Sequence, residues 1–198
     1  QLSAFHDKVN IKTKRATGFE KDVMSLINIV ESFKDIPFFK LSIGGFDTHR
    51  SQSETHAKLL GTLNDGLATL VRELKKKDLY DSTLIMTYSE FGRRPKENAS
   101  RGTDHGEANC HFILGGKVKG GKVYFGKQAN TRPNEGGYEL SQAHLDGKEN
   151  ISYKIDFRDI YQKILTDWWQ VKGLDSYRDE NDDLGYRGLT DDFSFLKA

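Results

Sequence analysis

The chain has 198 residues, of which 36% are hydrophobic and 30% are charged, and its formal net charge is +1. This length and composition predict a single globular domain over residues 1–198 with a core of its own, and they exclude an intrinsically disordered chain. The balanced charge disfavours nucleic acid as a partner. No apolar stretch approaches the roughly 18 residues that a membrane span requires.

The first half of the chain predicts a helix, a strand and a second helix. Apolar residues recur at helical spacing over 17–33, and residues 38–43 predict a strand that runs into a Gly-Gly turn. Residues 53–77 give the clearest helix, with one face formed by Leu59, Leu63, Leu67, Leu70 and Leu74. The side chain of Ser51 or Ser53 could cap the start of this helix.

The second half predicts more strands and a final helix. The nearly continuous apolar run over 82–90 is typical of a strand buried on both faces, as in a parallel sheet. Residues 110–116 and 121–126 predict two further strands, and residues 156–169 predict a helix. This order favours an α/β fold, a three-layer sandwich with a mainly parallel sheet. Residues 170–198 form a polar tail whose acidic residues do not fit the EF-hand pattern.

Several residues with reactive side chains are expected to have structural roles. Cys110 is the one cysteine of the chain, which excludes an internal disulfide, and we expect a buried, inert thiol because it begins an apolar run. His56 is expected in the first turn of its helix, and His111 is expected to pack or hydrogen-bond within the sheet. His6 and His144 are expected at the surface.

Asp47 and His49 form the first candidate metal-binding pair. They are two residues apart, so in an extended chain both side chains point to the same side. A carboxylate and an imidazole at the end of a strand are suitable metal ligands, and ligands usually bind α/β sheets at these open ends. The alternative is a capping aspartate beside a surface histidine.

A second group of polar residues lies between two apolar runs. Glu90 ends the first run, Arg93 and Arg94 follow it, and Asp104 and His105 precede the next run. Acids or histidines at three successive strand ends favour a functional cluster, in which the arginines bind a phosphate or sulfate group. The alternative is a structural network in which Glu90 and Asp104 pair with the neighbouring arginines, Arg93, Arg94 and Arg101.

The motifs "GGFDTH", "SEFGR", "GTDHG" and "GGKVKGGKVYFG", in this order over residues 37–169, resemble the domain of unknown function 1501 family. That family is placed in the alkaline phosphatase and sulfatase superfamily. The resemblance implies an α/β core that holds two divalent metals at its strand ends. Asp47 and His49 resemble one metal-binding segment and His105-Gly106 resembles another, whereas Ser89-Glu90 stands where an Asp-His pair is usual.

The resemblance implies a metal-dependent hydrolase of phosphate or sulfate esters, with an anionic small molecule or polymer as substrate and zinc, manganese or calcium as cofactor. The expected ligands are Asp47, His49, Glu90, Asp104 and His105. The superfamily nucleophile is not recognisable, so we expect the chain to be the C-terminal part of a longer domain, incomplete at its N-terminus. The alternative is a non-catalytic binding or structural module. Relatives often carry twin-arginine export signals, so a periplasmic or cell-envelope location in a bacterium is implied, although no signal peptide is visible here.

Overall fold

The computed structural model describes residues 18–33, 35–121, 150–151, 153, 155–173 and 195–196. The chain divides into two compact units, which are described separately below. The first unit comprises Gln1–Thr83 and Lys96–Asp104, and the second comprises Leu84–Pro95 and His105–Ala198. The expectation of one domain over the whole chain stays a prediction.

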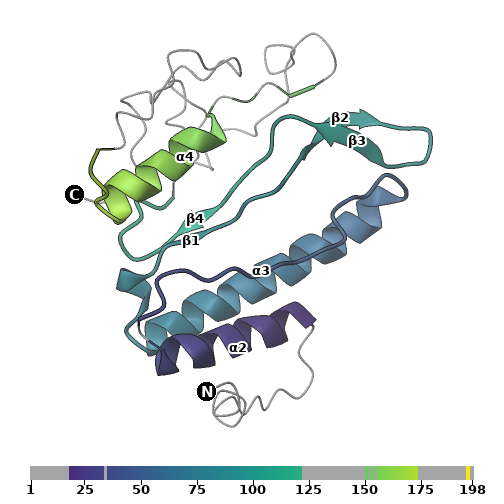
Figure 1. The fold of residues 1–198 in the computed structure, drawn as a ribbon. Helices are drawn as coiled ribbons and strands as arrows, with labels where there is room; N and C mark the ends of the chain where they lie inside the picture. The colour runs from purple at the N-terminus through teal and green to yellow at the C-terminus, as the bar shows by residue number, and fades with distance from the viewer. Residues whose placement is uncertain are drawn as a thin grey trace. The chain divides into compact units, whose positions relative to one another are not determined.

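Two helices form the body of the first unit. Helix α2 spans Gly18–Ser32 and helix α3 spans Gln52–Lys76, which confirms both helices predicted for this part of the chain. The helices lie side by side (Figure 1) and bury apolar side chains from both. These residues are Val23 and Ile27 of α2 and Leu70 and Leu74 of α3. Burying each such side chain contributes about 1.5–3 kcal/mol, so this contact is the core of the unit.

Gly66 allows the two helices to approach each other closely. A Cβ atom at this position of α3 would lie 2.3 Å from the ring of Phe19 on α2. The phenyl ring therefore fills the space that any other residue would occupy. A short 3-10 helix, η1, spans Tyr80–Ser82 after the end of α3.

The strand predicted over residues 38–43 is wrong. This segment forms no strand in the part of the chain that the structure describes, and Phe38 is 65% exposed. A strand requires a neighbour to satisfy its backbone groups, and none of the described residues pairs with this segment in a sheet.

A β-hairpin forms in the polar stretch between the two apolar runs. Strand β2 spans Gly92–Glu97 and strand β3 spans Thr103–Gly106, and the two form a two-stranded sheet. The hairpin tip, residues 96–104, belongs to the first unit.

The second unit contains a short sheet and a helix. Strands β1 (Ile85–Met86) and β4 (Ile113–Leu114) pair antiparallel, with Ile85 opposite Leu114. Helix α4 spans Phe157–Lys163 and continues as a π-helix, η3, over Ile164–Trp168, which confirms the last predicted helix. The core residues are Ile164 and Phe195, surrounded by Leu84, Met86, Ile113, Ile155, Ile160, Trp168 and Leu196.

The predicted three-layer α/β sandwich with a mainly parallel sheet is wrong. The described residues form only two two-stranded sheets, and β1 and β4 are antiparallel. The apolar run over 82–90 suggested a long buried strand, but only two of its residues pair. An apolar run does not reveal which segment will be its partner or in which direction that partner runs. Cys110, expected to be buried, is exposed.

Two other predictions lie largely or wholly outside the described residues, namely the strand over 121–126 and the polar tail. His6 and His144 also lie outside them. Among the helices that the structure describes, none has the length and apolar character needed to cross a lipid bilayer.

Candidate metal site

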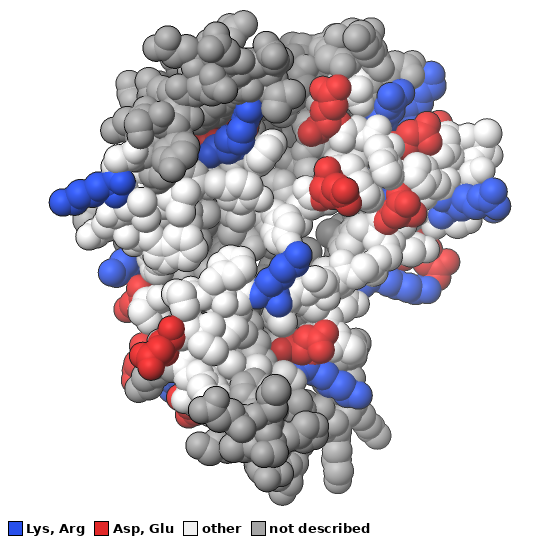
Figure 2. All heavy atoms as spheres, viewed as in Figure 1, with Lys and Arg blue, Asp and Glu red and all other residues white. Residues whose placement is uncertain are grey.

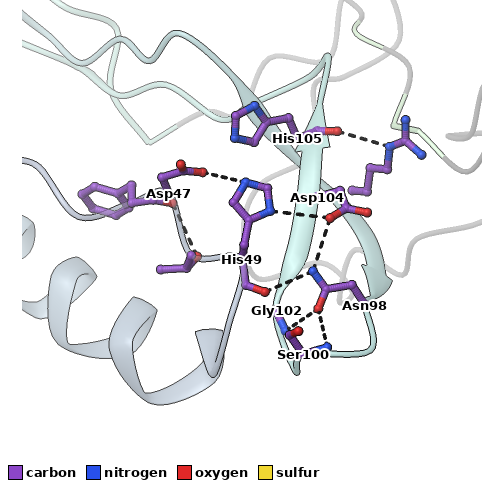
Figure 3. A network of polar contacts seen from close by, with 10 residues as sticks. Asp47, His49, Asn98, Ser100, Gly102, Asp104 and His105 are labelled. Atoms are coloured by element: carbon purple, nitrogen blue, oxygen red, sulfur yellow. Dashed lines mark hydrogen bonds and ion pairs between the residues drawn. The ribbon is translucent and has the colours of Figure 1, made fainter.

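The loop that leads into α3 holds Asp47 and His49 against each other. Thr48, between them, is only 5% exposed, and its amide donates to the carbonyl oxygen of Phe46 at 2.9 Å. The amide of His49 donates to the carbonyl oxygen of Asp47 at 3.2 Å, so the backbone turns tightly here. As a result, Nε2 of His49 lies 2.9 Å from Oδ1 of Asp47 (Figure 3).

Asp104, on strand β3, approaches the other side of the same imidazole. Its Oδ1 lies 3.5 Å from Nδ1 of His49, so both ring nitrogens face a carboxylate (Figure 3). The side chain of His49 is 44% exposed, and that of Asp104 is 59% exposed. A small ligand in solution can therefore reach this group.

Backbone contacts fix the hairpin tip to the start of α3. The amide of Ser51 donates to the carbonyl oxygen of Ser100 at 3.1 Å, and the amide of Gln52 donates to that of Arg101 at 2.8 Å. Helix starts leave amide groups without partners inside the helix, and the hairpin carbonyls accept two of them here. Ser51 is the N-cap residue but makes no side-chain cap bond, so the predicted side-chain cap is replaced by the hairpin backbone.

Backbone strain is concentrated at the same contact. Ser51 and Arg101 have φ values of 44° and 59°, in the left-handed region that non-glycine residues seldom adopt. Gly102 has no room for a side chain, because a Cβ atom there would lie 2.2 Å from the carbonyl carbon of His49. Strained residues persist where the surrounding contacts determine their conformation, often at functional sites.

His105 follows Asp104 in strand β3 and belongs to the second unit. Its ring stacks on Phe91, with centroids 3.8 Å apart and planes at 7°. Its carbonyl oxygen accepts a hydrogen bond from Nε of Arg94 at 3.2 Å. The role of His105 as a metal ligand stays a prediction.

The other predicted site residues also lie in the second unit. Glu90 is exposed at the bend before β2, and its role as a ligand stays a prediction. The guanidinium of Arg93 lies over the Phe91 ring at 5.3 Å from its centroid. The use of Arg93 and Arg94 to bind an anion also stays a prediction.

His56 has a structural environment in the first unit. Its Nδ1 lies 3.2 Å from Nε2 of Gln52, and its ring makes an edge contact with Phe46. This agrees with the expectation that His56 lies near the start of its helix.

The carboxylates of Asp47 and Asp104 and the imidazole of His49 suit a divalent cation. Carboxylate oxygens and imidazole nitrogens are ligands for zinc and manganese, whereas calcium prefers oxygen alone. The sequence analysis missed two supporting residues. Phe91 stacks on His105, and Asn98 donates a hydrogen bond to Asp104. The only sequence signal for Asn98 is its place in "ENASRG", a composition typical of turns.

Comparisons with known proteins bear on the family of the chain. Comparisons with curated proteins and with solved structures gave no match. A protein-family model described as "Protein of unknown function (DUF1501)" matches residues 7–178. This segment covers most of the sequence and includes the motifs that carried the resemblance, so the chain belongs to the DUF1501 family.

Proposed function

We propose that this protein binds a divalent cation through Asp47 and His49, with His105 as the further ligand that the motifs suggest. The observation that carries the proposal is the environment of His49, whose two ring nitrogens both face carboxylate oxygens. Asp47 lies at Nε2 and can share a cation with that nitrogen. His105, from the "GTDHG" motif, would supply a second imidazole.

Asp104 supports His49 in this proposal instead of serving as the ligand that the sequence suggested. Metal-binding histidines commonly donate their other ring N–H to a carboxylate, which fixes the tautomer and the orientation of the ring. Asp104 Oδ1, 3.5 Å from Nδ1, is suited to this role. Nε2 is then the nitrogen that remains for a cation.

We further propose that the site serves the hydrolysis of phosphate or sulfate esters, as the motifs suggest. A bound divalent cation would polarise the ester oxygen and lower the pKa of a coordinated water. The chain's own residues would hold the cation, and Arg93 or Arg94 would contact the anionic group. The exposure of Asp47 and His49 supports access for a soluble substrate.

The periplasm or cell envelope is the proposed location, and fractionation of the native organism with an antibody tests it.

A purely structural role for the same contacts is the second candidate. The hairpin tip hydrogen-bonds to the start of α3, so Asp104 could simply help to fix a loop. A polyanion-binding role is a third candidate, and the face shown in Figure 2 carries both acidic and basic side chains. Cation binding separates the first two candidates.

The test is calorimetric titration of chelator-treated protein with Zn²⁺, Mn²⁺ and Ca²⁺. We expect one tight site for Zn²⁺ or Mn²⁺, lost in His49→Ala and weakened in Asp47→Asn. His56→Gln and Asp65→Asn are matched controls that remove an imidazole and an acid from α3, and both should bind as the unaltered protein does. An absence of binding in the unaltered protein would overturn the proposal. Reduced stability in His49→Ala with no bound cation would favour the structural role.

Ester hydrolysis is tested by an assay that is independent of cation binding. Cation-loaded protein should release product from aryl phosphates or aryl sulfates, and His49→Ala should not. Tight cation binding with no turnover on either ester would leave the metal site but remove the hydrolase assignment.

A further inference from the structure

The side chain of Asn98 lies at the centre of the hairpin tip and has a single orientation that fits its neighbours. Its Oδ1 accepts hydrogen bonds from the amides of Ser100 at 2.9 Å and Gly102 at 3.1 Å. An amide nitrogen cannot accept those two bonds. The oxygen therefore faces the turn, and Nδ2 must face away from it.

Nδ2 of Asn98 contacts both segments that define the environment of His49. It donates to the carbonyl oxygen of His49 at 3.1 Å and to Oδ1 of Asp104 at 3.2 Å (Figure 3). This Oδ1 is the same atom that lies 3.5 Å from Nδ1 of His49. One amide group thus ties the His49 backbone to the carboxylate that faces the His49 ring.

We propose that Asn98 is a positioning residue for His49 and Asp104. Its Oδ1 shapes the turn, and its Nδ2 sets the distance between the Asp104 carboxylate and the loop that carries the imidazole. Asn98 touches neither a substrate nor a cation in this role. Its effect on cation affinity rests on the proposed function, whereas its effect on the His49 ring does not.

Substitution can separate the acceptor role of Asn98 Oδ1 from the donor role of its Nδ2. Asn98→Asp keeps an oxygen that accepts from the Ser100 and Gly102 amides, but it replaces the donor with a second oxygen that faces the His49 carbonyl and the Asp104 carboxylate. Repulsion should then move Asp104 away from the imidazole. Asn98→Ala removes both the acceptor and the donor. Ser100→Ala is the matched control, because the bond from Ser100 to Asn98 comes from the backbone amide.

Two readouts test the proposal on the full chain. The first is the ¹⁵N spectrum of the His49 ring in cation-free protein at a fixed pH, where we expect Asn98→Asp to change the Nδ1 signal and Ser100→Ala to leave it unchanged. The second is affinity for Zn²⁺, which we expect to fall about 10- to 100-fold in Asn98→Asp, the usual effect of losing a group that supports a ligand.

The outcomes are distinguishable. An Asn98→Asp protein with an unaltered ring spectrum would overturn the positioning role, whatever its affinity for zinc. If the unaltered protein binds no cation, the proposed function fails, and the ring spectrum still decides the role of Asn98. If Asn98→Ala does not fold, Asn98→Asp carries the test, because it keeps the acceptor that the turn requires.

Discussion

The imidazole of His105 and the phenyl ring of Phe91 lie parallel, with their centroids 3.8 Å apart. Both residues belong to the second unit, where Phe91 directly precedes β2 and His105 lies on β3. Stacking restricts the imidazole to one rotamer and one ring plane. A ligand imidazole that is already oriented loses less entropy when it binds.

Replacing Phe91 with Leu should therefore free the His105 ring. In the unaltered protein the phenyl ring current should move the carbon-bound ring protons of His105 upfield, and Phe91→Leu should return them to ordinary positions. Zinc affinity should fall several-fold if His105 is a ligand. Proton NMR and calorimetry measure the two effects. Phe112→Leu is the control, because it removes an exposed ring from the same unit. Unchanged His105 signals in Phe91→Leu would argue against the stack in solution.

Gly102 should not tolerate a side chain. A Cβ atom would lie 2.2 Å from the His49 carbonyl carbon and 2.6 Å from the Arg50 amide nitrogen, both of which are backbone atoms that cannot rotate aside. Gly102→Ala should push the hairpin tip away from the start of α3 and destabilise the fold by about 1–3 kcal/mol. Urea denaturation measures this. Gly44→Ala is the control, because its Cβ would meet nothing within 4 Å, and equal stability losses in the two variants would contradict the predicted clash.

Asp156 should stabilise helix α4 more strongly at neutral pH than in acid. Its carboxylate caps the helix by accepting from the Arg158 amide at 2.9 Å, and Oδ2 accepts from the Arg158 guanidinium at 2.9 Å. Hydrogen bonds from Arg158 hold the pKa of this carboxyl below its usual value of 3.8, although partial burial opposes the shift. The contribution is thus fully present above that usual value and is lost as the pH falls through the lower pKa of the folded state.

Asp156→Ala should cost about 1 kcal/mol at pH 7 and less near pH 2. Asp156→Asn keeps a capping oxygen without the charge, so it should retain part of the stability and show a weaker dependence on acid. Denaturation in urea at both pH values measures the difference. A cost for Asp156→Ala that is the same at pH 7 and pH 2 would show that the charge contributes nothing.

His111 should make the fold sensitive to mild acid. Burial lowers the pKa of its imidazole below the usual 6.5, and its buried Nδ1 has no hydrogen-bond partner among the described residues. The unfolded chain therefore binds a proton at a higher pH than the folded chain does. Stability should fall as the pH drops below about 6.5, and it should continue to fall down to the folded pKa.

His111→Leu should remove this part of the pH dependence. The slope of unfolding free energy between pH 7 and pH 5 should become smaller, as measured by thermal or urea denaturation across that range. His56→Gln provides the comparison with another partly buried histidine. An unchanged slope in His111→Leu would assign the acid sensitivity to other groups.

The sequence by itself determined the helices and the family. The spacing of Val23 and Ile27, and of Leu70 and Leu74, follows the helical period, and the buried faces of α2 and α3 contain those residues. Local periodicity is sufficient here because a helix satisfies its backbone within one segment. The ordered motifs likewise identified the DUF1501 family. Asp47 and His49 were predicted on the same side of an extended strand, and they are in contact at 2.9 Å through a tight turn instead.

The tertiary structure alone decided the strands and the supporting residues. A strand satisfies its backbone only through another segment, so the apolar runs over 38–43 and 82–90 could not show whether a partner exists or which way it runs. The same holds for Asn98, whose amide reaches His49 only because the hairpin tip folds back onto the start of α3. Contacts between residues distant in the chain depend on that approach, and nothing in the spacing of a single sequence records it.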